Sequence, residues 1–167
     1  MIAALDTYHF DNGSTTGVVL FEQWTDAVAS VEKICRLSGP TEPYIPGEFY
    51  KRELPCILAA LESLSGNIET IIVDSYVQLA PGKPGLGQKL FEALGASVNV
   101  VGVAKTRFYT AVDAIEICRG ESTRPLFVSA VGIEVNEAAR LVKAMHGHFR
   151  IPTLLKLADT LSRRETE

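Results

Sequence analysis

Four acidic residues stand at positions where a carboxylate group is costly unless it is paired, neutralised or bound to a metal. Asp6 interrupts an apolar segment at the start of the chain, and Asp74 ends the apolar run at 71–73. Glu53 opens a predicted helix, and Asp159 flanks the apolar stripe of the last predicted helix. An unpaired carboxylate is unfavourable in an apolar interior, whereas carboxylate oxygens are preferred ligands of Mg²⁺ and Mn²⁺. Together the four acids predict a metal site suited to Mg²⁺ or Mn²⁺.

Each acid also has a simpler interpretation when it is taken alone. An aspartate at the end of a strand, such as Asp74, is commonly a turn or capping residue. The helix dipole favours Glu53 in a first turn without any function, and Asp159 alone is typical of a solvated helix residue. The metal site therefore depends on convergence of these side chains in space, which sequence spacing does not establish.

One basic residue is placed where a phosphate group could meet it. Lys105 ends an apolar segment, "VVGVAK", and Gly102 within that segment would allow another backbone to approach closely. An ordinary charge at a strand end is the alternative interpretation of Lys105.

A stiff loop precedes Glu53 in the stretch "EPYIPGEFYKRE". Pro43 and Pro46 each remove a backbone donor and hold φ near about −65°, which excludes a helix interior or a central strand. Tyr44 and Ile45 are therefore expected at the tip of a rigid loop, followed by Gly47. Such a loop has the properties of an apolar wedge.

The elements that position these residues follow from periodicity and turn signals. Two strands are expected on either side of the hairpin signal Asp11-Asn12-Gly13, and a third strand follows them. The expected elements are strands at 1–10, 14–23, 27–37, 69–77 and 97–106, helices at 52–67 and 85–95, a hairpin within 109–132, and two C-terminal helices, one at 135–148 and one after Pro152. A three-strand antiparallel meander followed by alternating helices and strands predicts an α/β fold with a mixed sheet and flanking helices. A right-handed crossover would place the first and fourth strands together, and with them Asp6 and Asp74.

Composition narrows the function classes. The 167 residues are expected to form one domain, 1–167, and the net charge of −4 does not support nucleic-acid binding by itself. Three cysteines without a CxxC spacing favour a reducing, cytoplasmic location. The sequence contains neither a membrane-spanning run nor a signal-peptide pattern at its start. It also lacks a recognisable nucleophilic serine or cysteine, which argues against a covalent hydrolase.

Taken in order along the chain, several motifs resemble the endonuclease V family, whose members cut near deoxyinosine in DNA and in some cases inosine in RNA. The motifs are the Asp6 strand, "PYIPG" followed by "RE", "IIVD", "VGVAK", "PLFVSAVG" and "FRIP…LAD". The resemblance implies a ribonuclease H-like fold, Mg²⁺ or Mn²⁺ as cofactor, and DNA or RNA as partner.

The resemblance also implies roles for particular residues. Asp6, Glu53, Asp74 and Asp159 fall on the metal-coordinating acids of the family, and Lys105 falls on its active-site lysine. The segment 43–46 matches its strand-separating wedge, in which Tyr44 would stack beside a flipped base. Gly47 belongs to the motif "PYIPG" and Gly102 to the motif "VGVAK", and both are expected at the nucleic-acid interface.

The chain departs from the family around the base pocket. Ser75 stands where the family usually has a glycine bordering that pocket, and its side chain would obstruct hypoxanthine. Ala80 and Gly82 stand where an active-site histidine and arginine are expected. Three functions remain open: a metal-dependent nuclease with weak activity, a nucleic-acid-binding homologue with lost or much reduced cleavage, and a protein-interaction module that keeps only the fold.

Overall fold

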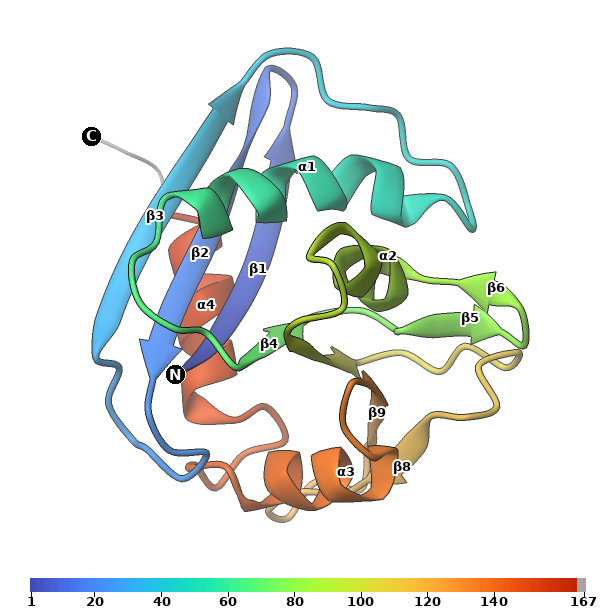
Figure 1. Ribbon diagram of the computed structural model, residues 1–167. Coiled ribbons are helices and arrows are strands. Elements are labelled where there is room, and N and C mark those ends of the chain that lie inside the picture. The colour runs from blue at the N-terminus through green and yellow to red at the C-terminus, as the bar shows by residue number, and fades with distance from the viewer. Residues whose placement is uncertain (165–167) are drawn as a thin grey trace.

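The computed structural model describes residues 1–164, so the last three residues of the predicted domain 1–167 lie outside it. The strands and helices in chain order are β1 (Ile2–Phe10), β2 (Gly13–Phe21), β3 (Val31–Ser38), α1 (Phe49–Glu62), β4 (Thr70–Val73), β5 (Gln78–Ala80), β6 (Lys83–Pro84), α2 (Leu86–Ala93), β7 (Asn99–Ala104), β8 (Ile115–Ile117), β9 (Leu126–Val131), α3 (Val135–Ala144) and α4 (Thr153–Ser162). A seven-stranded sheet has the order β3-β2-β1-β4-β7-β9-β8, and β5 and β6 form a separate two-stranded ribbon (Figure 1). Within residues 1–164, no helix is both long and apolar enough to cross a bilayer.

The sheet combines an antiparallel meander with parallel central strands. β1, β2 and β3 pair antiparallel in sequence order, as the hairpin signal predicts. β4 returns to pair parallel with β1, with Leu5 opposite Val73, and β7 pairs parallel with β4. The predicted adjacency of the first and fourth strands is confirmed. Asp6 and Asp74 each follow one residue after this register pair, and so lie on neighbouring strands.

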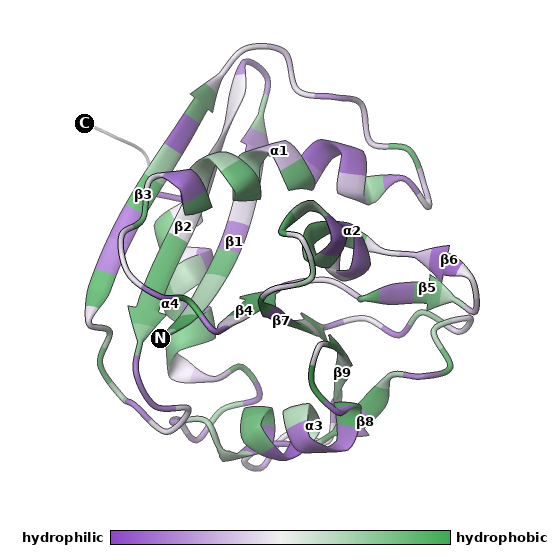
Figure 2. Cartoon of the chain, in the orientation of Figure 1, coloured by the Kyte–Doolittle hydropathy of each residue, from purple (hydrophilic) through white to green (hydrophobic). Residues whose placement is uncertain are grey.

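Helices cover both faces of the sheet. One apolar cluster joins alternate strand residues such as Ala4, Ile72 and Val101 to α3 and α4. The other joins the intervening residues, such as Leu5, to α1 and α2. Figure 2 shows the apolar central strands with more polar segments on the outer parts of the helices. Burial on both faces explains why β4 is an uninterrupted apolar run rather than an alternating one.

Helix α4 packs very closely on the meander because β2 contains Gly17. A Cβ atom at Gly17 would lie 2.3 Å from the carbonyl oxygen of Ala158, so any larger residue would push the helix away from the sheet. This contact brings the end of α4, with Asp159 and Ser162, next to Asp6 of β1. Sheet pairing and a single glycine therefore position two of the predicted site acids.

Several boundaries differ from the sequence prediction. α1 begins at Phe49, before the predicted start at 52, because turn hydrogen bonds from Glu48 and Lys51 continue the proline loop into the helix. Glu53 therefore lies in the second turn and not at the helix start. The third strand begins at Val31, four residues later than expected.

The predicted strand 69–77 is shorter than expected. β4 ends at Val73, and the chain then leaves the sheet with its next apolar residues, Tyr76 and Val77, still buried. Tyr76 packs with Phe127 in a small separate cluster, so its apolar character reflects packing below the sheet edge and not strand pairing. The ribbon of β5 and β6 was not predicted, because each of its strands is too short to show a period.

Candidate active site

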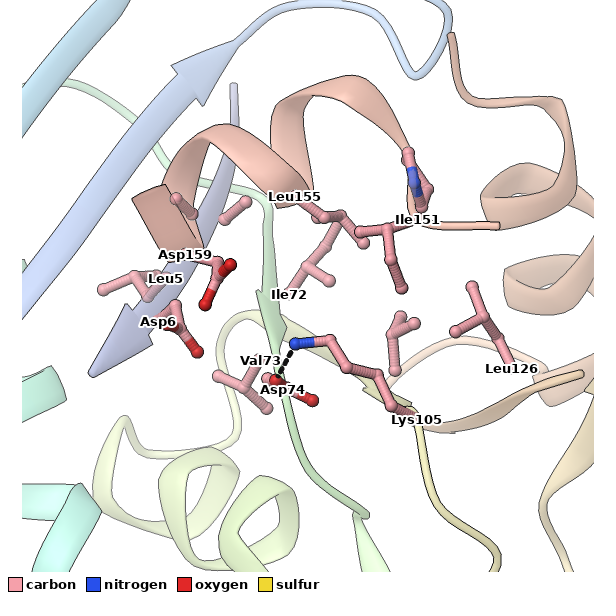
Figure 3. A pocket seen from close by; sticks show the side chains of 14 residues that line it. Leu5, Asp6, Ile72, Val73, Asp74, Lys105, Leu126, Ile151, Leu155 and Asp159 are labelled. Carbon is pink, nitrogen blue, oxygen red and sulfur yellow. Dashed lines mark hydrogen bonds and ion pairs between the residues drawn. The ribbon is translucent and has the colours of Figure 1, made fainter. Parts of the chain in front are cut away.

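Asp6 and Asp74 share a small cavity with Asp159 and Lys105 at the point where β1 and β4 separate. The cavity has a volume of about 30 Å³ and is otherwise lined mainly by apolar residues (Figure 3). The Lys105 ammonium group donates a hydrogen bond to Asp74 at 2.5 Å. The structure thus brings together three of the four predicted acids and the predicted lysine.

Asp6 is a carboxyl group whose charge is poorly compensated. Burial raises the pKa of Asp6 to about 6 from an ordinary value of 3.8, and the neighbouring charges of Asp74 and Asp159 act in the same direction. Ser162 Oγ donates to Asp6 Oδ2 at 2.8 Å and lowers the pKa, but by less than burial raises it. A cation beside Asp6 would remove this penalty, because it favours the ionised form.

Asp159 is buried and tightly held. Lys156 Nζ donates to its Oδ2 at 2.5 Å, and Arg163 Nε donates to its Oδ1 at 2.8 Å. Burial by itself would raise the pKa of Asp159, yet the two hydrogen bonds and the charge of Arg163 outweigh it and lower the pKa. The alternative interpretation of Asp159 as a solvated helix residue is therefore wrong.

Lys105 is held by the acids that surround it. Burial would lower its pKa, but the hydrogen bond to Asp74 and the charges of Asp74, Asp6 and Asp159 raise it overall. Lys105 is consequently a permanent positive charge at the mouth of the acidic cavity. It does not match the alternative of an isolated strand-end charge.

Glu53 borders a second, larger cavity on the side of α1. This cavity has a volume of about 310 Å³ and is also lined by Asp6, Asp74 and His9. His9 Nε2 lies 2.6 Å from Glu53 Oε1, and the two side chains are only 6% and 7% exposed. When the Glu53 carboxylate accepts this hydrogen bond, His9 Nε2 is the donor.

His9 was missed in the sequence because a lone histidine near the end of a strand gives no strong signal. Its position does carry a weak one: Leu5, Thr7 and His9 alternate along β1 and so face the same side of the sheet as α1, which carries Glu53. The other buried nitrogen of His9, Nδ1, has no hydrogen-bond partner among residues 1–164.

The side chains do not form a completed metal cage as they stand. Within residues 1–164, no three His, Cys, Asp or Glu side chains are grouped closely enough to hold an ion. The convergence of the acids on which the predicted metal site depends is therefore not met within the described residues. Instead, Glu53 is bonded to His9 and Asp74 to Lys105.

The available donors nevertheless fit a hard divalent cation. Asp6 and Asp74 supply carboxylate oxygens from adjacent parallel strands, and both line the two cavities between Glu53 and Asp159. The raised pKa of Asp6 marks a carboxyl group that would gain from a neighbouring cation. An all-oxygen donor set of this kind suits Mg²⁺ or Mn²⁺.

The predicted wedge is a loop with an exposed apolar tip. Between β3 and α1, Tyr44 is 60% exposed and Ile45 is 45% exposed, and the Tyr44 ring packs edge-on against Phe49 with centroids 6.2 Å apart. Gly47 has φ of +81°, and a Cβ there would lie 2.9 Å from Lys83 Nζ. Only glycine adopts this turn without strain.

Comparison with known proteins decides the family. The endonuclease V family model matches residues 1–123. Endonuclease V of Streptomyces avermitilis is 31% identical over 168 residues, covering 88% of this chain and 71% of the relative. The chain belongs to the endonuclease V family. Endonuclease V of Thermus thermophilus is 29% identical over 181 residues, covering 94% of this chain and 78% of the relative.

Solved structures of endonuclease V have the same ribonuclease H-like fold. Ciona intestinalis endonuclease V, in complex with a 24mer DNA containing an inosine followed by a ribo-adenosine, aligns with a TM-score of 0.79 at 16% identity, covering 97% of this chain and 83% of that one. The Streptomyces avermitilis enzyme aligns with a TM-score of 0.74 at 23% identity, covering 97% and 79%. The resemblance and the fold predicted from the motifs are both confirmed.

The residues that depart from the endonuclease V pattern lie between Asp74 and β6. A Cβ at Gly102 would lie 2.3 Å from the Ser75 carbonyl oxygen. Gly102 therefore allows the turn after β4 to pack on β7, which is the close backbone approach expected from the sequence. Ala80 ends β5, and Gly82 has φ of +73° in the turn to β6. An arginine in place of Gly82 would be strained in this backbone conformation.

Proposed function

We propose that this endonuclease V family member is an endonuclease that hydrolyses phosphodiester bonds near deoxyinosine, inosine or another altered base with the help of Mg²⁺ or Mn²⁺. One observation carries the proposal: Asp6 in β1 and Asp74 directly after the neighbouring parallel strand β4 share one cavity with Asp159 and Lys105. Paired carboxylates next to a fixed lysine are suited to phosphoryl chemistry, in which charge stabilisation is the main demand on the protein.

Asp6 and Asp74 would hold the ion, with Glu53 and Asp159 on either side of them completing its shell or orienting a water molecule. When bound, a divalent ion in such a site supplies charge stabilisation to a phosphate oxygen and lowers the pKa of bound water. Asp6 belongs to β1 and Asp74 directly follows β4, so the sheet positions both, which supports their use as the central ligands.

The remaining residues have roles that follow from their contacts. Lys105 places a positive charge beside Asp74, where it would stabilise charge on the scissile phosphate. Lys156 and Arg163 fix the orientation of Asp159. His9 fixes Glu53 by the hydrogen bond between their buried side chains.

The proline loop would engage the nucleic acid beside the altered base. Pro43 and Pro46 keep the loop stiff, so that Tyr44 and Ile45 enter the disturbed stack without a large ordering cost. A relative with the same fold has been crystallised with inosine-containing DNA, which supports the choice of substrate class. Gly47 lets the loop turn close to Lys83.

A second candidate is a nucleic-acid-binding homologue with lost or much reduced cleavage. Ser75, Ala80 and Gly82 favour it, because each departs from the residue that the endonuclease V pattern places near the base or phosphate. The pairing of Asp74 with Lys105 is compatible with either candidate.

The deciding experiment compares cleavage of labelled DNA and RNA strands with and without inosine, in Mg²⁺, in Mn²⁺ and in excess chelator. Metal-dependent cutting of an inosine strand that is absent in Asp74→Asn is the expected result. Binding without cleavage in either metal would establish the second candidate instead. If the protein neither binds nor cleaves these strands, only its fold would be shared with the family.

A further inference from the structure

A groove outside the acidic cavities is lined by arginine and aromatic side chains. It has a volume of about 620 Å³ and lies over the outer ends of β1, β2 and β3 beside the end of α4. We call it the arginine groove; the side chains that define it are Tyr8, Phe10, Thr15, Arg36, Arg163 and Arg164. Its aromatic members are well exposed, at 43% for Tyr8 and 46% for Phe10.

The groove exists because α4 covers only part of its sheet face. Tyr8, Thr15 and Arg36 form one row across the meander, with Tyr8 opposite Thr15 and Thr15 opposite Arg36. The preceding row contains Gly17, on which α4 packs, and the helix ends at Ser162 (Figure 1). Beyond that point, no helix or strand of residues 1–164 covers the sheet row.

Positive side chains line the groove on a chain whose net charge is −4, although the charge of Arg163 is paired with that of Asp159. Arg36, Arg163 and Arg164 line it, and no Asp or Glu of residues 1–164 does. The Arg163 guanidinium lies 4.9 Å from the centre of the Tyr8 ring, which keeps both groups at the groove wall. Arg36 donates a hydrogen bond to the backbone carbonyl of Arg164 at 3.4 Å and so closes the opposite side.

The arginine groove is continuous with the candidate active site. Ser162 forms its inner end and donates a hydrogen bond to Asp6 at 2.8 Å. Arg163 lines both the groove and the larger acidic cavity, and it also holds Asp159. Asp6 and Tyr8 lie two residues apart on one strand, and so face the same side of the sheet.

We propose that the arginine groove binds the part of the nucleic-acid strand that extends from one side of the scissile phosphodiester. The inference rests on the proposed function and adds a subsite to it. Arginines match phosphate groups, and exposed aromatic rings stack on bases; their combination beside a catalytic site fits a single strand with little sequence preference. A strand held at Asp6 and Asp74 and leaving toward α4 would enter this groove.

The test measures binding of single-stranded inosine oligonucleotides by fluorescence anisotropy in Ca²⁺. A short core strand is compared with two versions, one extended on the 5′ side and one on the 3′ side. Each extension has about eight nucleotides, which is within the range of site sizes of single-strand-binding modules. The protein is compared with Arg36→Gln and Tyr8→Leu. Arg140→Gln is the matched control, because Arg140 is an exposed arginine of α3 paired with Glu137, outside both cavities and the groove.

One of the two extensions is expected to tighten binding by about five- to tenfold, as stacking and phosphate contacts of this kind do. Arg36→Gln and Tyr8→Leu should lose that gain, whereas Arg140→Gln should keep it. Arg36→Gln should also reduce the slope of log K against log salt by about 0.7, the contribution of one phosphate contact on a single strand. If Tyr8→Leu does not fold, the exposed Arg36 variant decides alone.

The proposal is overturned if neither extension tightens binding, or if Arg36→Gln keeps the gain as the control does. The proposal is also overturned if polyglutamate competes as effectively as an oligonucleotide at the same concentration of charge. That result would show that the groove binds acidic polymers in general. Failure of the nuclease proposal looks different. Cleavage would then be absent while the extension effect and its loss in Arg36→Gln remain.

Discussion

His9 and Glu53 form a buried pair that joins β1 to α1: Nε2 of His9 lies 2.6 Å from Oε1 of Glu53, and the two side chains are 6% and 7% exposed. The pair sets the orientation of an acid that borders the same cavity as Asp6 and Asp74. A residue to which the sequence assigned no role therefore orients a predicted site residue.

Replacing His9 by leucine should lower both stability and activity. Leucine fills a similar volume but leaves the buried Glu53 carboxyl group without its donor, which costs about 1.5–3 kcal/mol of the free energy of unfolding. Loss of orientation should also reduce cleavage or metal affinity by about ten- to a hundredfold. Urea unfolding, calorimetric metal binding and single-turnover cleavage measure the three effects.

His9→Gln is the matched control for this change. Its amide can still donate to Glu53, so stability and metal affinity should stay close to those of the original protein. Equal behaviour of the leucine and glutamine variants would show that the hydrogen bond has no positioning role.

Replacing Asp74 by asparagine should remove cleavage and leave the fold intact. The amide cannot balance the charge of a metal ion, so we expect a loss of at least about a hundredfold, more than one ordinary charged contact would cost. The pair with Lys105 is partly exposed, so its loss should change stability by no more than about 1 kcal/mol. Undiminished cleavage by the purified variant would exclude Asp74 from the reaction.

Asp6 should make the metal-free protein less stable as pH rises. Its pKa is raised from 3.8 to about 6 by burial, so the folded state keeps the proton over a range in which the unfolded state loses it. Stability present at low pH is therefore lost between about pH 4 and pH 6, by about 3 kcal/mol in total, and stays low above that range.

Urea unfolding of the protein and of Asp6→Asn, in chelator from pH 4 to pH 8, tests this expectation. The variant should become the more stable of the two as pH rises through that range, and the difference should then remain constant. Added Mg²⁺ should reduce the difference at pH 7 by stabilising only the original protein. A difference that does not change with pH would contradict the assignment of this titration to Asp6.

Substitutions next to Asp74 should limit cleavage at inosine, and partial reversal should restore some of it. A missing charged or hydrogen-bonding group at a phosphate site costs about 1.5–3 kcal/mol, or roughly one to two orders of magnitude in rate. Ser75→Gly combined with Ala80→His should therefore raise inosine-specific cutting more than either change alone. Gly82 is left unchanged because its φ of +73° disfavours arginine.

Rates on inosine-containing and unmodified strands, measured side by side, provide the readout for these variants. The double variant should increase the ratio of the two rates, and not only the rate on the modified strand. Strong inosine-specific cleavage by the original protein would show that Ser75 and Ala80 do not impair the site.

Except for the short ribbon of β5 and β6, the sequence by itself determined the elements of the fold and their order. Alternating and continuous apolar runs, the Asn12-Gly13 turn and the prolines at 43 and 46 act over a few residues, so strand, helix and loop assignments follow from local chemistry. The parallel pairing of the first and fourth strands also followed, because crossover connections have a strongly preferred hand. These rules were sufficient to place Asp6 beside Asp74.

Only the tertiary structure decided which partner each acid takes. His9 and Glu53 are 44 positions apart, and Ser162 and Asp6 are 156 positions apart, so no local pattern relates them. Glu53 is bonded to His9 and Asp74 to Lys105, and within residues 1–164 three acids do not meet at one point. Likewise, the arginine groove depends on where α4 ends over Gly17, a relation between segments that share no sequence neighbourhood. Side-chain contacts of this kind depend on distances in the folded chain, which spacing along the sequence does not specify.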